Sequence, residues 1–237
     1  GKEYDKIKLF NSSTTSLDEE VKLLARVPLL FQPSTKWRYS VSMDVLARIL
    51  EVVLQKSLQD ILQIQIFSPL EMKDTAFYIR ESNINRLMKS YEYNVLENKL
   101  TELIPDPQKI GNYGYPVNNK TYARGGHGLY STLDDYMKFA VMLNSGKSQD
   151  GKNIIKKETI DLMTKNLLPS DFFPIEILST GIIKDENYIN DLEPYGWGLG
   201  FRTLMDPSKN ENLGTIGEFG WGGAAATYFL VDSEKEI

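Results

Sequence analysis

The first half of the chain alternates apolar and polar positions with the period of amphipathic helices. Ser16 and Glu19 have the spacing of a capping box, so we expect a helix that begins at Leu17 and ends before Pro28. A more apolar helix is expected from Ser42 onward. Its apolar positions at helical spacing are Leu46, Ile49, Leu50 and Val53.

Three more helices are predicted downstream by the same periodicity. Ser57 is placed to cap one of them, with Leu58, Ile61 and Leu62 on its buried side. Thr132 precedes an amphipathic pattern that runs to Leu143, and residues 158–165 form another helical segment. Between them, residues 83–122 are rich in Asn, Pro and Tyr, and we expect loops there.

The pattern changes near residue 191, where glycine-rich segments alternate with turn residues. Residues 227–231 alternate with the period of two that is typical of a strand. Helices first and antiparallel strands afterwards predict an α+β fold. We therefore expect one domain in which residues 1–190 are mainly helices and loops and residues 191–237 are strands of a sheet.

Composition excludes several classes of function. The net charge of -5 argues against nucleic acids and anionic membrane surfaces as partners, because both need clustered Lys and Arg. The longest apolar run is too short for a membrane span, and the first residues lack the pattern of a signal peptide. The absence of cysteine excludes disulfides, thiolate nucleophiles and cysteine-based zinc sites.

Metal and histidine chemistry are disfavoured by the same inventory. His127 is the single histidine, and its glycine-rich setting, Gly125-Gly126-His127-Gly128, is more typical of a tight loop than of a ligand. The sequence has no Gly-x-Ser-x-Gly elbow for a serine triad. The glycines around Trp197 do not have dinucleotide-binding spacing and are better explained by close approach of strands. No metal and no cofactor are expected.

Four segments, in this order along the chain, carry a resemblance to a known family. They are Trp37–Leu46 (WRYSVSMDVL), Phe67–Phe77 (FSPLEMKDTAF), Gly128–Tyr136 (GLYSTLDDY) and Gly217–Tyr228 (GEFGWGGAAATY). Together they resemble the serine β-lactamase and penicillin-binding protein superfamily, and most of all the esterases built on the class C β-lactamase fold. The resemblance covers nearly the whole chain and implies a β-lactamase/transpeptidase-like fold.

The resemblance also implies site residues. In that family a Ser in Ser-x-x-Lys attacks the substrate carbonyl, a Tyr relays the proton, and a glycine-rich strand binds the substrate. Tyr39 occupies the position of the Tyr. Trp221, Gly222 and Gly223 occupy the place of Lys-Thr-Gly, and the N–H of Ala224 is the expected oxyanion donor of that strand.

Two departures from the family pattern bear on the substrate. Val41 stands where β-lactamases of this class have Asn, two residues after the Tyr, which removes an amide that contacts the β-lactam side chain. Trp221 replaces the Lys that pairs with the antibiotic carboxylate. By resemblance, both changes favour small-molecule esters or amides with neutral, apolar acyl groups over penicillin-like anions.

The chain contains no Ser-x-x-Lys. Ser34 and Lys36 are two residues apart, and residues at that spacing do not share a helix face. We therefore expect a partial domain, incomplete at both ends: a helical lobe with part of an antiparallel sheet, lacking the nucleophile helix. Unpaired sheet edges would favour association into a homo-oligomer. Relatives occur in cytoplasm and periplasm, so the compartment stays open.

Two functions from different classes remain at this point. The first is part of a serine hydrolase that acts through an acyl-enzyme, more like an esterase than a β-lactamase, and inactive without the missing Ser and Lys. The second is a non-catalytic relative that keeps the cleft as a binding or interaction module. Under the second hypothesis, Tyr39 is structural and its replacement by Phe changes little.

Overall fold

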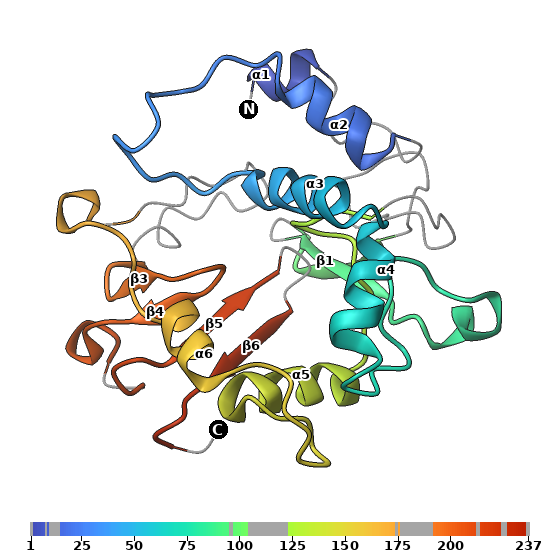
Figure 1. The fold of residues 1–237 in the computed structure, drawn as a ribbon. Helices are drawn as coiled ribbons and strands as arrows, with labels where there is room; N and C mark the ends of the chain where they lie inside the picture. Colours follow the sequence, from blue (N-terminus) through green and yellow to red (C-terminus); the bar gives the residue numbers. More distant parts are fainter. Residues whose placement is uncertain are drawn as a thin grey trace. The chain divides into compact units, whose positions relative to one another are not determined.

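The structure is a computed structural model and describes residues 2–7, 9, 15–94, 97–103, 123–173, 175, 192–211, 214–223 and 227–235. Two compact units are formed from interleaved parts of the chain. The first comprises residues 1–28, 41–67 and 73–132, and the second comprises residues 29–40, 68–72 and 133–237. Each unit is described by itself below (Figure 1).

The first unit contains helices and a two-stranded sheet. Its elements are α1 (Lys2–Lys6), α2 (Leu17–Leu24), α3 (Ser42–Leu54), α4 (Leu58–Leu62), the π-helix η1 (Gln63–Phe67), the 3-10 helix η2 (Glu81–Arg86), β1 (Ser90–Asn94) and β2 (Lys99–Leu103). The expected capping box is confirmed at α2: the Ser16 N–H donates to Glu19 Oε2 at 2.8 Å, and the Glu19 N–H donates to Ser16 Oγ at 3.3 Å. Ser57 likewise caps α4.

The core of this unit joins helices to the segment that follows residue 122. Its buried members are Leu17, Ala47, Leu58, Phe77 and Ala123. A buried ion pair ties the same parts together, because Arg124 Nε lies 2.6 Å from Glu20 Oε2. Arg124 also donates to the carbonyl oxygens of Thr15 and Ala123, which satisfies the guanidinium nitrogens that burial removes from water.

The glycine-rich loop after Arg124 lies directly on α3. A Cβ on Gly125 would come within 2.0 Å of the Met43 carbonyl oxygen, so only glycine fits at this contact. The Gly126 N–H donates to the carboxylate of Asp44, which is buried, at 3.0 Å. Loop and helix are therefore joined by a backbone contact and a charge-assisted hydrogen bond.

The prediction of loops throughout residues 83–122 is wrong in part. β1 and β2 pair antiparallel, with Ser90 opposite Leu103 and Asn94 opposite Lys99. Both strands are largely exposed, and tyrosines alternate with polar residues in β1, so the polar composition concealed a period of two. Residues 104–122 lie outside the described part of the chain.

The second unit contains the four-stranded sheet and two helices. Its elements are α5 (Leu133–Ser145), α6 (Lys157–Thr164), the 3-10 helices η3 (Ser170–Phe172) and η5 (Pro207–Lys209), and the strands β3 (Tyr195–Trp197), β4 (Arg202–Leu204), β5 (Phe219–Gly222) and β6 (Tyr228–Val231). All neighbours in the order β3-β4-β5-β6 are antiparallel. The α+β class and the antiparallel strands are confirmed. The predicted change at residues 190–191 falls on residues that are not described.

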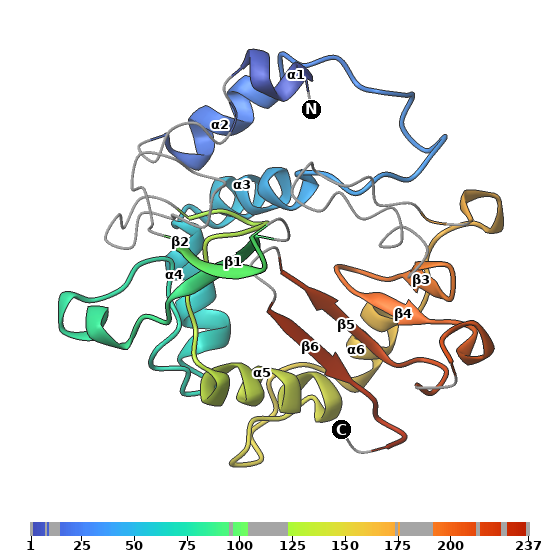
Figure 2. The same cartoon turned by 180° about the vertical axis from the view of Figure 1, so that it is seen from behind.

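One face of this sheet packs on helices. Figures 1 and 2 show α6 on one side of the sheet, and α5 contacts β6. The rings of Tyr136 and Phe229 join α5 to β6 at 5.3 Å, and Thr203 donates to the carbonyl of Thr164 at the end of α6. The buried core of this unit includes the cluster of Ile175, Leu192, Tyr195 and Leu204.

The apolar positions predicted for α3 do not lie in the core. Leu46, Ile49, Leu50 and Val53 are between 37% and 70% exposed, and the buried residues of the helix are Asp44 and Ala47. Solvent-exposed apolar surface of this extent is typical of a face that packs against something else. Among the described residues, no helix is both long enough and apolar enough to cross a membrane.

Candidate active site

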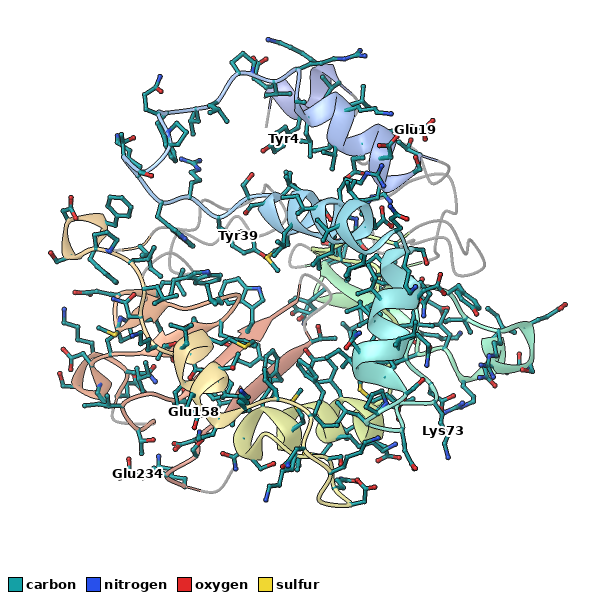
Figure 3. All side chains as sticks on the ribbon, in the orientation of Figure 1. Tyr4, Glu19, Tyr39, Lys73, Glu158 and Glu234 are labelled. Atoms are coloured by element: carbon teal, nitrogen blue, oxygen red, sulfur yellow. The ribbon has the colours of Figure 1, made fainter. Side chains whose placement is uncertain are left out.

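The tryptophans and Tyr39 form one aromatic cluster in the second unit. Trp37 and Tyr39 lie on the segment before α3, Trp197 ends β3, and Trp221 lies in β5 (Figure 3 labels Tyr39). The ring centroids of Tyr39 and Trp221 are 5.3 Å apart, and those of Tyr39 and Trp197 are 5.9 Å apart. Trp197 in turn meets Trp221 at 4.7 Å and Trp37 at 5.0 Å. Tilted and edge-on pairs at these separations are favourable.

The turn after α6 holds Trp197 in place through its backbone. The Trp197 N–H donates to Asn166 Oδ1 at 3.1 Å, and its carbonyl accepts from the Leu167 N–H at 2.9 Å. A Cβ on Gly196 would meet the Asn166 side chain at 2.7 Å, and a Cβ on Gly198 would meet the Met163 carbonyl oxygen at 2.1 Å. The interpretation of these glycines as sites of close backbone approach is therefore confirmed at Gly198, whereas the neighbour of Gly196 is a side chain and Gly200 has no neighbour within 4 Å.

Tyr39 is placed at the surface of this cluster. Its side chain is 39% exposed, while Trp37, Trp197 and Trp221 are each partly buried. The ring of Tyr39 therefore packs on Trp197 and Trp221 while the residue stays partly open to solvent.

The other predicted site residues are distributed as follows. Gly222 ends β5 directly after Trp221, and Gly223 follows it with its N–H donating to the carbonyl of Thr227 at 2.8 Å. Because that amide is already used, Gly223 has no N–H left for an oxyanion. Ala224 lies outside the described residues. Val41 is the N-cap residue of α3 and belongs to the first unit.

The glycines of β5 have a structural role as well. A Cβ on Gly222 would lie 2.9 Å from the Tyr228 ring, and a Cβ on Gly223 would lie 2.3 Å from Thr227 Oγ1. The absence of side chains lets the ring of Tyr228 lean over β5. Glycine at position 222 therefore leaves room on this face of the sheet for the ring of Tyr228.

Charged groups also lie on this sheet. The Arg202 guanidinium lies over the ring of Tyr195 at 4.2 Å and over the ring of Tyr228 at 5.0 Å. Burial raises the pKa of Glu218 above its usual value, and the neighbouring Asp232 acts in the same direction, whereas Arg202 and Lys235 oppose the shift. The sheet thus carries a stacked cation next to a carboxyl group that resists ionisation.

His127 lies in the first unit, in the loop that contacts α3. Burial lowers its pKa, the Asp44 carboxylate opposes this shift, and Arg124 adds to it. Within the described ranges, no group of three or more Asp, Glu or His side chains is arranged to hold a metal ion.

A profile of the Beta-lactamase family matches residues 3–237, which is almost the entire chain. The chain belongs to the Beta-lactamase family. The recognition made from its four segments is confirmed, and the match agrees with the helices and antiparallel strands described above. The curated relatives of this chain include two proteins that are named as esterases.

Three relatives illustrate the range of this family. Lovastatin esterase of Penicillium rubens is 33% identical over 224 residues, which are 89% of this chain and 51% of that protein. EstCE1, a hydrolase with promiscuous acyltransferase activity, superposes with a TM-score of 0.76 at 21% identity over 98% of this chain and 58% of its own. An octameric penicillin-binding protein homologue from Pyrococcus abyssi superposes at 0.62 with 18% identity, over 93% of this chain and 42% of its own.

The two structural likenesses show the fold alone, since identity is below a quarter in both. The chain spans about half the length of the curated relatives it matches.

Sequence reasoning missed three residues of this site. Trp37 stands in the quoted segment Trp37–Leu46, and Trp197 stands in a glycine-rich segment that was assigned only to strand packing. Asn166 lies in a turn far from either in sequence, and only the fold brings its side chain to β3. Aromatic residues flanked by glycine were the available signal for Trp197, but nothing in the sequence pointed to Asn166.

Proposed function

We propose that this chain is part of a serine hydrolase that acts on esters or amides through an acyl-enzyme. The observation that carries the proposal is the contact between Tyr39 and Trp221, at the strand that ends in Gly222, in a chain of the Beta-lactamase family. Tyr39 is the proton-transfer residue, Trp221 and Gly222 of β5 bind the substrate, and the N–H of Ala224 donates to the oxyanion. The nucleophile and its lysine come from residues outside this chain.

The chemistry follows from the acidity of phenol. A free phenol has a pKa of about 10, so a tyrosine can act as a base at neutral pH only when a cation stabilises its phenolate. A lysine one helical turn from the nucleophilic serine supplies that cation in this type of site. The serine is then activated without histidine, and an amide of the strand stabilises the oxyanion by about 3 kcal/mol.

The preference for esters over β-lactams has two supports. Curated relatives include lovastatin esterase, and this chain has Val41 and Trp221 where β-lactamases carry an amide and a cation. The cluster of Trp37, Trp197 and Trp221 offers apolar surface for an acyl chain.

Turnover measurements test this proposal. This chain and a polypeptide extended at both ends are each incubated with p-nitrophenyl butyrate and with nitrocefin. We expect no turnover by the chain alone, hydrolysis of the butyrate by the extended protein, and little hydrolysis of nitrocefin. An extended protein that forms no acyl-enzyme, or that prefers nitrocefin, contradicts the proposal.

The second candidate is a binding module without catalysis. It is favoured by one observation, the absence of Ser-x-x-Lys from a chain that keeps the aromatic cluster. It predicts that p-nitrophenyl butyrate quenches tryptophan fluorescence in a saturable way, even in the extended protein, without release of nitrophenol.

Association through a sheet edge is part of the proposal. β3 and β6 are the outer strands of the described sheet, but the backbone of Trp197 in β3 is already bonded to Asn166 and Leu167. β6 is therefore the edge that a second copy of this chain would extend. A penicillin-binding protein homologue of this fold is octameric, which is consistent with assembly in this family.

A further inference from the structure

The guanidinium of Arg202 is packed between aromatic rings and has no hydrogen-bond partner among the residues that the structure describes. Its guanidinium lies between the rings of Tyr195 and Tyr228, at 4.2 Å and 5.0 Å from their centroids. Both distances are within the range of favourable cation–π contact. The rings therefore fix the plane of the guanidinium without using any of its N–H donors.

The donors of Arg202 divide into two groups. Nε is buried and has no partner among the described residues. The two terminal nitrogens make no hydrogen bond or ion pair within the described structure, and neither is among its buried unpaired atoms, so they reach solvent. An arginine with a purely structural role usually satisfies its buried donors, whereas Nε of Arg202 is left unpaired among the described residues.

The strands place this fork beside the candidate active site. Arg202 pairs with Trp197 on one side and with Gly220 on the other, and directly paired residues project from the same face of a sheet. Gly220 and Gly222 carry no side chain there, so Arg202 can reach across β5 to Tyr228, which is the partner of Gly222. Trp197 in turn contacts Tyr39.

We propose that Arg202, held by Tyr195 and Tyr228 across the glycines of β5, binds a carboxylate group of the substrate. This proposal rests on the proposed function in one respect: the carboxylate is part of the ester or amide that binds at the site. Trp221 removes a cation from β5, and Arg202 supplies one from the neighbouring strand β4. The substrate expected on this basis is an ester or amide that carries a free carboxylate at Arg202 in addition to the apolar group that contacts the tryptophans.

The charges around Arg202 are compatible with this role. Glu218 interacts with Arg202 electrostatically, and burial together with the neighbouring Asp232 raises the pKa of that carboxyl group. The net charge of -5 repels anions from the protein as a whole. Binding of a carboxylate therefore depends on the local fork, whose planar geometry matches a carboxylate in a bidentate manner.

A pair of ligands that differ only in charge tests the proposal. Monomethyl glutarate and dimethyl glutarate are titrated into the full chain at low ionic strength, with tryptophan fluorescence as the signal because Trp197 is the strand partner of Arg202. We expect the monoanion to bind at least about tenfold more tightly than the diester, the value of one charge-assisted hydrogen bond. Arg202→Gln should abolish this difference, and Arg80→Gln, at an exposed arginine of the first unit, should keep it.

Equal affinity of the unmodified chain for the two esters overturns the proposal, as does a charge preference that survives in Arg202→Gln. If circular dichroism shows that this variant does not fold, the unmodified chain alone decides. Its preference must then fall as salt is added, and a preference unaffected by salt also overturns the proposal. A titration with glutarate shows whether the site binds the substrate or the released acid. Tighter binding of glutarate than of monomethyl glutarate would assign the site to the product. None of these measurements requires turnover, so their outcome is independent of whether an acyl-enzyme forms.

Discussion

At the scale of single residues, the charged state of His127 is the clearest consequence of the fold. Burial lowers its pKa below the ordinary value of 6.5. The unfolded chain therefore binds a proton more readily than the folded chain, and the free energy of unfolding falls as the pH drops through 6.5 towards the lower folded value. The titratable and charged groups acting on the imidazole are Asp44 and Arg124.

The substitution His127→Gln should remove this dependence. Urea unfolding is measured about one pH unit above and about one unit below 6.5, the range in which an unperturbed histidine titrates. The unmodified chain should lose more stability between the two conditions than the variant does. Carboxyl groups titrate equally in both proteins and cancel in the comparison. An equal loss in the two proteins would show that His127 titrates alike in the folded and unfolded chain.

Residue-scale prediction from sequence succeeded where a residue acts through its immediate neighbours. Ser16 and Glu19 formed the expected cap because both partners lie within one helical turn. Arg202 was not predicted, since its role depends on Tyr195 and Tyr228 from two other strands. The placement of Trp221 beside Tyr39 came from family resemblance and not from any local pattern.

At the scale of elements, the contact between the glycine-rich loop and α3 makes a sharp prediction. Gly125→Ala places a methyl group 2.0 Å from the Met43 carbonyl oxygen, so helix or loop must move. Gly126→Ala meets nothing closer than 3.7 Å, at the Asp44 carboxylate. We expect the first change to destabilise the fold by about 1–3 kcal/mol or more, and the second to change stability by about 0.5 kcal/mol or less.

Thermal and urea unfolding of the two variants measure this difference. Because the two glycines are adjacent and receive the same added methyl group, each serves as the control for the other. Equal stability of both variants would mean that the loop does not rest on α3 as described.

Element-scale prediction was good for helices and weaker for strands. The helices predicted at Ser16, Ser42, Ser57 and Thr132 are all present, since each has an apolar helical period. β1 and β2 were missed because they are exposed on both faces, so no apolar alternation marks them. The apolar period of α3 correctly predicted a helix. Its apolar residues are exposed, however, so the period does not identify what packs against them.

At the scale of the whole molecule, the unpaired edge at β6 predicts self-association. Sedimentation velocity should show oligomers whose share rises with protein concentration. Leu230→Lys places a charge on the edge strand at a residue that is 37% exposed and should shift the population towards monomer. Leu29→Lys, at a residue that is 74% exposed and outside every strand, should not.

A chain that remains monomeric at every concentration contradicts this prediction. The prediction is also contradicted if Leu230→Lys and Leu29→Lys lower the share of oligomer equally. Association would then depend on exposed apolar residues in general and not on the edge of β6. The exposed face of α3 is a second apolar surface, and it belongs to the first unit. Because the chain spans about half of its curated relatives, such surfaces are expected where the remainder of a relative's fold has no counterpart here.

The most direct test of the central claim follows acyl-enzyme formation by mass spectrometry in the extended protein. With p-nitrophenyl butyrate, the account predicts an acyl group on a serine outside residues 1–237, and a rate of acylation that falls by about 10²- to 10⁴-fold in Tyr39→Phe, the contribution of a proton-transfer group. Tyr91→Phe, at an exposed tyrosine of β1, should acylate at the unmodified rate. An acyl group on a serine within these residues, or an unchanged rate in Tyr39→Phe, would contradict the account.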